Sequence, residues 1–191
     1  ADNLKVHVMI AAWEWGSYLG EDNMKNGIRI RTSSYIRHFA HPSLSGAKMN
    51  GNYINSMMAL KEAQDHGFDE ALMLDVDGFV SEGSGENIFV IKDEVIYTPH
   101  LTSALPGITR DTIFTLAKSL EYKIVEKKIS CDDIYSADEA FFTGTAAEVT
   151  PIRDLDGNQI GIGSRGLITE KLQSLYFDCV HGRNDEYLHW I

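Results

Sequence analysis

Four short apolar segments follow one another in the middle of the chain, and tight turns separate them. The segments are residues 71–74, 79–81, 87–91 and 95–98. Asp77-Gly78 has the composition of a hairpin turn, and Lys92-Asp93-Glu94 supplies a second turn. Strands this short and this close together leave no room for helices between them, so the pattern disfavours a regular doubly wound sheet. We predict a meander at this point of the sequence.

Further strands are predicted on both sides of the meander. They are expected at residues 6–13, 28–33, 123–126, 139–143 and 149–153. The first is an apolar run typical of a buried strand, and the second alternates apolar and polar side chains as a half-buried strand does. Residues 35–46 are rich in histidine, proline, serine and glycine and are interpreted as a loop, and Asp156-Gly157 is interpreted as a turn.

Three segments carry apolar side chains at helical spacing. The first runs from Asn52 to a C-terminal cap at Gly67, the second begins with Thr109 as its N-cap, and the third covers residues 167–179. The apolar faces expected to be buried are Tyr53, Ile54, Met57, Met58, Leu60 and Ala63; Ile113, Leu116, Ala117 and Leu120; and Ile168, Leu172, Leu175 and Tyr176. In the tail, Trp190 is expected to act as an aromatic anchor.

The order of these elements determines the fold class that we expect. Two strands, a helix, a meander, a second helix, further strands and a last helix do not repeat a regular unit. A chain of 191 residues can enclose a substantial core, and neither a linker nor an internal repeat divides it. We therefore predict one α/β domain with a mixed, partly closed β-sheet flanked by helices.

Charge and composition narrow the class of function. The formal charge of −11 argues against binding to nucleic acid or to an anionic membrane surface, because both favour basic proteins. No run of about 18 apolar residues is present, so no membrane-spanning helix is expected. The two cysteines, Cys131 and Cys179, lie far apart and are expected to be reduced thiols in a cytoplasmic protein.

Lys48 is the candidate for covalent chemistry. Lysine forms an imine with an aldehyde cofactor and releases it to an incoming amine, and a partly desolvated lysine can also move a proton. The small residues Gly46, Ala47 and Gly51 let a flat ring approach the backbone at this point. A solvated surface lysine is the competing interpretation, and composition alone favours it.

A carboxylate is the second requirement, because a pyridine ring accepts electrons well only while its nitrogen stays protonated. Glu82 ends a predicted strand and precedes a Gly-Ser-Gly turn, where the glycines allow close approach to a ring. Glu86 is the competing carboxylate, and a solvated acidic turn is the alternative for both. Tyr53 is placed to hydrogen-bond a ring hydroxyl and serves equally well as a core aromatic.

Phosphate is the third requirement, and helix N-termini bind it through free backbone N–H groups and a favourable dipole. Residues 105–109, Leu-Pro-Gly-Ile-Thr, lead into the second predicted helix, where Thr109 can also donate its hydroxyl. Residues 144–146 follow a predicted strand, so Thr145 can serve a phosphate or a substrate carboxylate. Taken singly, each is also an ordinary turn or cap. A lysine, an acid and these loops together indicate pyridoxal 5'-phosphate (PLP).

Two further motifs are discounted. Residues 161–166 match the G-x-G-x-x-G pattern, but a turn rather than a buried strand precedes them, so we reject a dinucleotide site. His38 and His41 have a spacing found in metal sites but lack a third ligand. A solvated loop is the better interpretation there, and no metal is expected.

The joint spacing of the site segments resembles that of the branched-chain amino acid aminotransferases, in the fold-type IV group of PLP enzymes. The resemblance is carried by residues 48–53 (KMNGNY), 81–87 (SEGSGEN), 105–111 (LPGITRD) and 144–151 (GTAAEVTP). It implies transfer of the amino group of L-leucine, L-isoleucine or L-valine to 2-oxoglutarate, which gives branched 2-oxo acids and glutamate. The fold that it implies is that of the large domain of enzymes like D-amino acid aminotransferase.

The resemblance also implies a role for each site residue. Lys48 resembles the lysine that holds the cofactor covalently and is the expected catalytic residue. The expected cofactor contacts are Lys48, Tyr53, Glu82, Leu105, Gly107, Ile108, Thr109 and Thr145. Thr145 and Ala146 are expected to contact the substrate.

Members of this family are longer than the present chain. Residues 1–191 are therefore expected to form the cofactor-binding large domain without the N-terminal small domain, and to turn over slowly or not at all. The resemblance implies a homodimer or a higher homo-oligomer that acts on amino acids and 2-oxo acids. D-Amino acid aminotransferase, aminodeoxychorismate lyase and a non-catalytic domain remain as alternatives.

Overall fold

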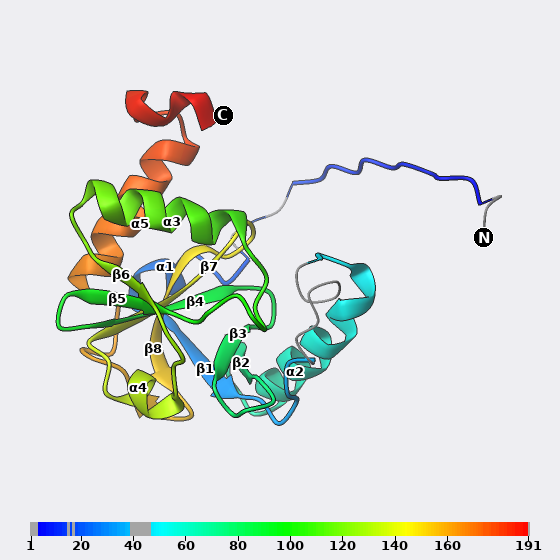
Figure 1. Ribbon diagram of the computed structural model, residues 1–191, viewed down its shortest axis with the longest axis horizontal. Coiled ribbons are helices and arrows are strands. Elements are labelled where there is room, and N and C mark those ends of the chain that lie inside the picture. The colour runs from blue at the N-terminus through cyan, green and yellow to red at the C-terminus, as the bar shows by residue number, and fades with distance from the viewer. Residues whose placement is uncertain (1–3, 15, 17, 39–46, 191) are drawn as a thin grey trace.

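The computed structural model describes residues 4–14, 16, 18–38 and 47–190 (Figure 1). The helices are α1 (Asn23–Asn26), α2 (Tyr53–Asp65), α3 (Ile108–Ser119), α4 (Cys131–Tyr135) and α5 (Leu167–Val180), with the short 3-10 helices η1 (Asn50–Asn52) and η2 (Asp185–Trp190). The strands are β1 (Ile28–Thr32), β2 (Glu70–Leu74), β3 (Val80–Gly83), β4 (Asn87–Lys92), β5 (Val95–Thr98), β6 (Ile124–Glu126), β7 (Glu139–Gly144), β8 (Glu148–Leu155) and β9 (Asn158–Gln159). The three long helices and the four short central strands are confirmed. The predicted meander is wrong, because these strands form two hairpins, β2-β3 and β4-β5, and β3 does not pair with β4. The elements α1, α4 and β9 were not predicted.

The strands of the described residues form one mixed sheet. Its order is β3-β2-β1-β8-β7-β4-β5-β6, and β9 extends the pairing of β8. β1 runs parallel to both β2 and β8, β5 runs parallel to β6, and the other pairs are antiparallel. Only residues 84–86 join β3, at the edge, to β4 in the other half of the sheet. The sheet therefore curls back on itself, which confirms the predicted partly closed architecture.

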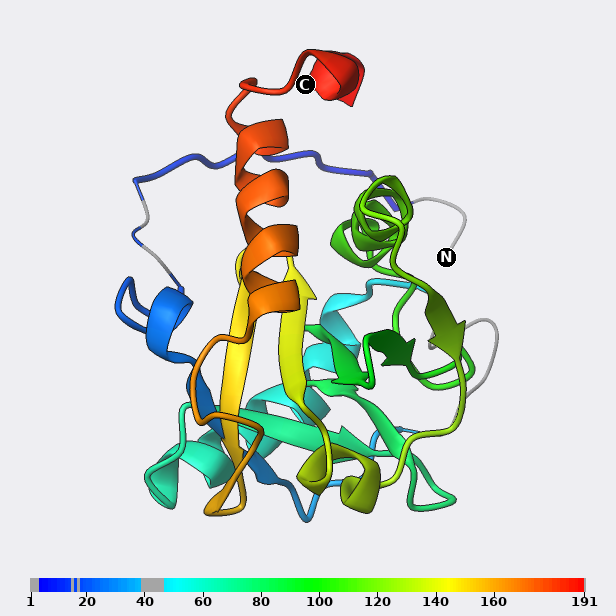
Figure 2. The same cartoon turned by 90° about the vertical axis from the view of Figure 1, so that its left-hand side faces the viewer.

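Both faces of the curled sheet are buried. Along β4 the side chains alternate, so that Ile88 and Val90 enter one core while Phe89 and Ile91 enter the other. The second core lies beneath α3 and α5, which pack beside each other over the sheet (Figures 1 and 2). There the ring of Phe89 stacks on that of Phe141 with 5.0 Å between centroids. Burial of each such side chain contributes about 1.5–3 kcal/mol, so this core fixes α3 relative to the sheet.

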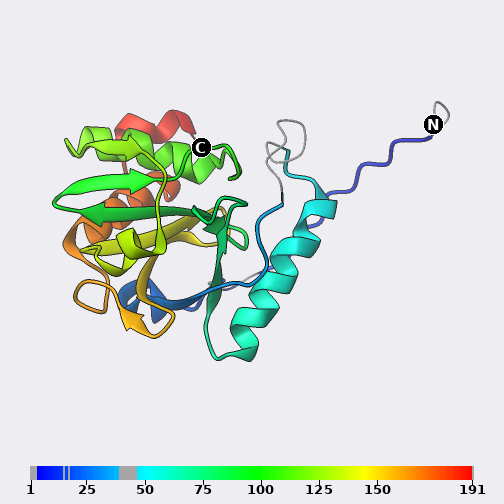
Figure 3. The ribbon, with the colours of Figure 1, turned by 60° about the horizontal axis from the view of Figure 1, so that its bottom comes forward.

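The predicted buried face of α2 is confirmed at Ala63 and wrong for its large side chains. Ser56, Ala59 and Ala63 are the buried residues of this helix, and they face Ala71 and Met73 of β2. Small side chains allow the helix to lie close to the sheet, as its position alongside β2 illustrates (Figure 3). The larger side chains that were expected to be buried point outward instead. Those most exposed are Ile54 (68%), Met57 (64%) and Met58 (47%).

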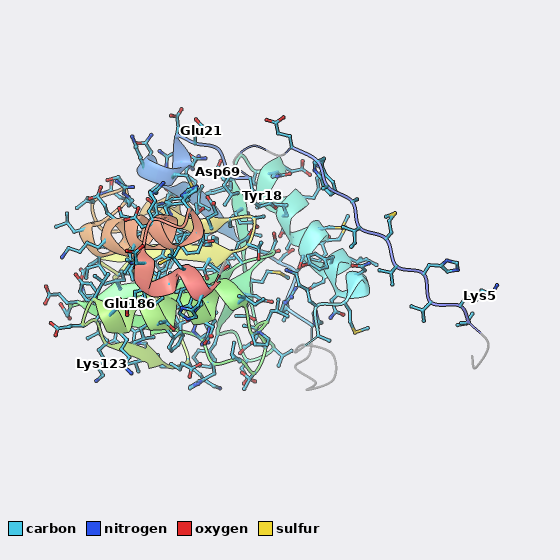
Figure 4. The ribbon with its side chains drawn as sticks, turned by 90° about the horizontal axis from the view of Figure 1, so that it is seen from above. Lys5, Tyr18, Glu21, Asp69, Lys123 and Glu186 are labelled. Carbon is cyan, nitrogen blue, oxygen red and sulfur yellow. The ribbon has the colours of Figure 1, made fainter. Side chains whose placement is uncertain are left out.

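The predicted strand at residues 6–13 is also wrong. These residues have no regular secondary structure, and Val6, Val8 and Ile10 are at least 86% exposed. The segment projects from the body of the molecule, with Lys5 at its far end (Figure 4). An apolar run indicates a tendency to be buried, but a strand forms only where a neighbour supplies hydrogen bonds. None of the strands in the described part of the chain pairs with this segment.

Three local expectations need correction or lie outside the structure. α3 begins at Ile108 with Gly107 as its N-cap, so Thr109 belongs to the first turn and does not cap the helix. In the tail, Tyr187 is the buried aromatic, whereas Trp190 is 41% exposed and rests on the Tyr187 ring. Most of the predicted loop at residues 35–46, including the second histidine of the discounted pair, lies outside the described residues. Among the residues described, no helix is long and apolar enough to cross a membrane.

Candidate functional site

Two cavities adjoin at the turn between β3 and β4. The first is lined by Arg37, Ala47, Lys48, Met49, Asn52, Tyr53, Ser56, Glu82, Ser84, Gly85, Glu86, Asn87 and Leu105. The second is lined by Lys48, Gly85, Asn87, Leu105, Pro106, Gly107, Ile108, Thr109, Thr143, Gly144 and Thr145. The residues common to both linings are Lys48, Gly85, Asn87 and Leu105.

The fold brings most of the predicted site residues to these two cavities. Lys48, Tyr53, Glu82 and Leu105 line the first cavity, and Gly107, Ile108, Thr109 and Thr145 line the second. Ala146 is outside both linings and belongs to a neighbouring depression that also includes Thr145, Tyr18 and Glu148. The predicted acid and the predicted phosphate loop therefore lie on either side of the predicted lysine.

Lys48 lies at the boundary between the two cavities and is exposed. The partial desolvation expected for a proton-transferring lysine is therefore not supplied by the described residues of this chain. Tyr53, at the start of α2, is 37% exposed and lines the first cavity, so its alternative role as a core aromatic is wrong. Both side chains are accessible to a ligand that enters from solvent.

Glu82 is buried in the wall of the first cavity. Its Oε2 atom accepts a hydrogen bond of 2.9 Å from the backbone N–H of Leu105. Its Oε1 atom lies 2.6 Å from Nη2 of Arg37 but accepts no hydrogen bond of good geometry from the described residues. Burial raises the pKa of Glu82, and the Arg37 charge and the Leu105 N–H act in the opposite direction. Glu82 thus presents a buried oxygen, Oε1, that can still accept a hydrogen bond.

Arg37 is held in place from two sides. Its backbone N–H donates to the carbonyl of Leu74 at 2.8 Å, which attaches residue 37 to the end of β2. Its Nη1 atom donates to Oγ of Ser56 on α2 at 2.8 Å. The guanidinium is therefore fixed beside Glu82 by the same elements that build the cavity, and it supplies a positive charge directly to that acid.

Glu86, the competing carboxylate, is in a different environment. It is buried, and its Oε2 atom accepts a hydrogen bond of 3.0 Å from the N–H of Gly85. A side chain at Gly83 would collide with this carboxyl, so glycine is needed there. Burial and the nearby Glu70 raise the pKa of Glu86 well above its ordinary value. This environment favours the neutral form of Glu86.

The N-terminus of α3 faces the second cavity. Gly107 precedes the helix in an extended conformation, and no side chain of the described residues caps the first turn. The free N–H groups of the first turn therefore form a site suited to an anion. Thr109 lines the same cavity.

Sequence reasoning assigned no role to Arg37 or Asn87. Arg37 lies in a loop without a recognisable motif, so the sequence carries no signal for it. Asn87 ends the quoted segment SEGSGEN, but an asparagine after a glycine-rich turn is too common to indicate a role by itself. Both are positioned by contacts between segments that are distant in the sequence. For metals, the described residues contain no cluster of three or more candidate ligands.

Comparison with known proteins places these segments among aminotransferases. The family model of class IV amino-transferases matches residues 1–155. The chain is 60% identical to a branched-chain-amino-acid aminotransferase of Pseudomonas aeruginosa over 190 residues, which are 100% of this chain and 62% of the relative. It is 44% identical to the enzyme of the same name from Escherichia coli K12, over 96% of this chain and 60% of the relative. The chain thus spans about 60% of the length of these curated relatives.

Solved structures give the same result. The branched-chain aminotransferase of Thermoproteus uzoniensis with norvaline matches with a TM-score of 0.88 and 42% identity, over 94% of this chain and 59% of that one. The branched-chain amino acid aminotransferase of Escherichia coli matches with a TM-score of 0.85 and 46% identity, over 87% of this chain and 55% of that one. Both agree with the curled sheet and the helices described above.

A third solved structure contains a form of the cofactor. It is a branched-chain amino acid aminotransferase from T.th. with pyridoxamine 5'-phosphate. The match has a TM-score of 0.89 and 47% identity, over 93% of this chain and 58% of that one. The fold of the present chain is therefore one that holds a pyridoxamine phosphate in a protein of similar sequence.

Proposed function

The chain belongs to the class IV amino-transferase family, and on that premise we propose that it forms the cofactor-binding part of a branched-chain-amino-acid aminotransferase. The single observation that carries this proposal is that Lys48 lies between the Glu82 cavity and the cavity at the N-terminus of α3. The identity to relatives of that name supports the substrate class. Because those relatives are longer than this chain, the proposed reaction is that of the full-length protein.

We propose PLP as the cofactor. When bound, PLP supplies an aldehyde that condenses with amines and a protonated pyridine ring that withdraws electrons from the substrate. The residues present fit this group. Glu82 offers a buried oxygen with remaining capacity to accept a hydrogen bond, and the uncapped start of α3 offers free N–H groups to a phosphate. Tyr53 lines the same cavity as Lys48 and Glu82, where a ring hydroxyl would be placed.

Lys48 is assigned two roles. Its amine holds the cofactor covalently until an amino acid displaces it, and the released amine then moves the proton of the substrate α-carbon. Both roles require a flexible side chain that reaches the two cavities from their boundary. Desolvation by the bound ligand would favour the neutral amine that accepts this proton.

Glu82 and Arg37 are assigned the electrostatic role. A carboxylate next to the pyridine nitrogen keeps that nitrogen protonated, and the guanidinium at 2.6 Å opposes the rise in the pKa of Glu82 that burial causes. At the other end, the first turn of α3 and the hydroxyls of Thr109 and Thr145 are assigned to the phosphate. Thr145 and Ala146 border the neighbouring depression, to which we assign the substrate carboxylate.

The proposed substrates are L-leucine, L-isoleucine and L-valine, with 2-oxoglutarate as the amino acceptor. We further propose a homodimer or higher homo-oligomer in the cytoplasm. The exposed apolar side chains of α2 support an assembly because surfaces of this kind are normally covered. The free thiols of Cys131 and Cys179 support a reducing compartment.

A substrate panel tests the proposal. The chain is loaded with PLP and mixed separately with L-leucine, D-alanine and aminodeoxychorismate while the visible absorbance of the cofactor is followed. L-Leucine alone is expected to convert the absorbance to that of the aminated cofactor and to release a 2-oxo acid. A response to D-alanine or aminodeoxychorismate instead would favour the related enzymes of this fold, and a protein that never binds PLP would support a non-catalytic domain.

A further inference from the structure

Asn87 lies at the boundary between the two cavities. It is the first residue of β4, it pairs with Thr143 of β7, and it is 6% exposed. It lines both cavities, yet the roles assigned above make no use of it. A buried amide nitrogen is costly to leave unpaired, and the structure gives this one a partner.

The nitrogen of this amide holds Leu105. Nδ2 of Asn87 donates to the carbonyl oxygen of Leu105 at 2.8 Å. The N–H of the same residue, Leu105, donates to Oε2 of Glu82 at 2.9 Å. One peptide segment is therefore attached by its N–H to the predicted acid and by its carbonyl to Asn87, at the point where the chain turns toward α3.

The oxygen of the amide limits the position of the helix. A Cβ atom built on Gly107 would collide with Oδ1 of Asn87, so this oxygen rests directly against the N-cap residue of α3. Any larger residue at position 107 would require either the Asn87 side chain or the start of α3 to move. The assignment of the two amide atoms follows from the hydrogen bond, since only the nitrogen can donate to the Leu105 carbonyl.

We propose that Asn87 is a positioning residue that sets the distance between Glu82 and the N-terminus of α3. This distance would then match the one between the ring nitrogen and the phosphate of PLP. This inference rests on the function proposed above and deepens it. The ring of PLP is rigid and its phosphate arm is short, so the nitrogen and the phosphate both contribute fully to affinity only if their protein partners lie within a narrow range of separations. Asn87 itself contacts neither reacting atom.

The test compares PLP with pyridoxal, which has the same ring and aldehyde but no phosphate. The ratio of the Kd for pyridoxal to the Kd for PLP measures what the phosphate contributes, and both constants come from spectroscopic titration of the purified chain. In Asn87→Ala this ratio is expected to fall about tenfold, the equivalent of one lost hydrogen bond, while the Kd for pyridoxal changes less than about threefold. Asn87→Asp keeps the shape but lacks the donor, and the same fall is expected.

Thr98→Val is the matched control. Oγ1 of Thr98 in β5 donates to the carbonyl of Ile88 in β4 at 2.8 Å. Like the Asn87 bond, it is a buried hydrogen bond from a side chain to the backbone, but Thr98 lines neither cavity. A comparable loss of stability is expected in thermal unfolding, with the ratio of the two Kd values unchanged. If Asn87 were important only for folding, the two variants would behave alike.

Gly107→Ala supplies a second, independent arm. The added methyl group is expected to lower the ratio of Kd values in the wild-type background, because it pushes against Oδ1 of Asn87. In the Asn87→Ala background the clash is absent, so Gly107→Ala is expected to cause little additional loss. Additive losses in the double variant would contradict direct contact as the cause.

Two outcomes would overturn the inference while leaving the proposed function intact. In the first, wild-type protein binds PLP and the Asn87 variants keep the wild-type ratio. In the second, the variants lose affinity for PLP and pyridoxal equally. If the wild-type protein binds neither compound, the proposed function itself fails and the inference fails with it.

Discussion

Nη2 of Arg37 lies 2.6 Å from Oε1 of Glu82, inside a cavity whose wall leaves the two side chains 12% and 4% exposed. The two residues come from segments that are distant in the sequence, and the fold alone brings them together. An ion pair this deeply placed is costly to break, because removing one partner leaves a buried charge uncompensated.

Arg37→Met is therefore expected to destabilise the chain by about 3 kcal/mol and to raise the pKa of Glu82 further. A protonated Glu82 cannot hold a protonated pyridine nitrogen, so PLP affinity is expected to fall as well. Urea unfolding and PLP titration measure the two effects. The double variant Arg37→Met/Glu82→Gln carries no unpaired charge and is expected to regain stability; equal stability of the single and double variants would contradict the ion-pair account.

The two carboxyl groups of the turn are expected to respond differently to amide substitution. Glu82→Gln removes the charge assigned to the pyridine nitrogen and is expected to slow the half-reaction with L-leucine by about 100-fold or more, the scale of losing one electrostatic stabiliser. Burial and the nearby Glu70 raise the pKa of Glu86, so Glu86→Gln is expected to change the rate by less than about threefold. Stopped-flow absorbance measures both rates. The reverse order of effects would assign the acid to Glu86.

Stability is expected to depend on pH through Glu70. This carboxyl is buried in β2, its Oε1 accepts from the N–H of Ala71, and burial raises its pKa from 4.5 to about 7. The folded state therefore binds the proton more tightly than the unfolded state, so stability is lost as pH rises from 4.5 through 7. Glu70 is expected to contribute about 3 kcal/mol to this loss of stability. In Glu70→Gln, the free energy of unfolding measured with urea is expected to change less between pH 4.5 and pH 7, and the variant is expected to be more stable than wild type at about pH 8, above the raised pKa. An unchanged dependence of the unfolding free energy on pH would contradict this prediction.

The observed orientation of α2 has a direct mutational test. Ala59 is fully buried against β2, so Ala59→Leu is expected to destabilise the chain by about 1–3 kcal/mol through overpacking. Met57 is 64% exposed, so Met57→Gln is expected to change stability by less than about 0.5 kcal/mol. Thermal unfolding distinguishes the two. A larger loss in the Met57 variant would mean that the helix packs with its large apolar side chains inward.

Local patterns in the sequence permitted prediction of the elements that they define. Turn residues such as Asp77-Gly78 separated the strands of the two hairpins correctly, and the apolar spacing of α3 and α5 identified their buried faces. The failures share a cause. Periodicity identifies apolar side chains but not the surface that covers them, so the stripe of α2 was placed inside and the segment before Gly16 was predicted as a strand.

The residues of the candidate site fall into the same two groups, those indicated by local sequence and those revealed only by the fold. Lys48, Glu82 and the loop before α3 belong to motifs of small residues whose spacing is visible in the sequence. Arg37 and Asn87 act through contacts that exist only after the sheet has curled, with Glu82 in one case and with Leu105 and Gly107 in the other. Residues of this kind have ordinary sequence surroundings, so only the structure reveals them.

Covalent attachment of the cofactor at one amine is the step on which the proposed function depends most. Reduction of the PLP-loaded chain with borohydride converts that attachment into a stable phosphopyridoxyl group, and peptide mass spectrometry then locates it. We predict the group on Lys48 at stoichiometric yield, and its loss in Lys48→Arg. A label on a different lysine, or one spread over several surface lysines in proportion to their exposure, would contradict the central claim.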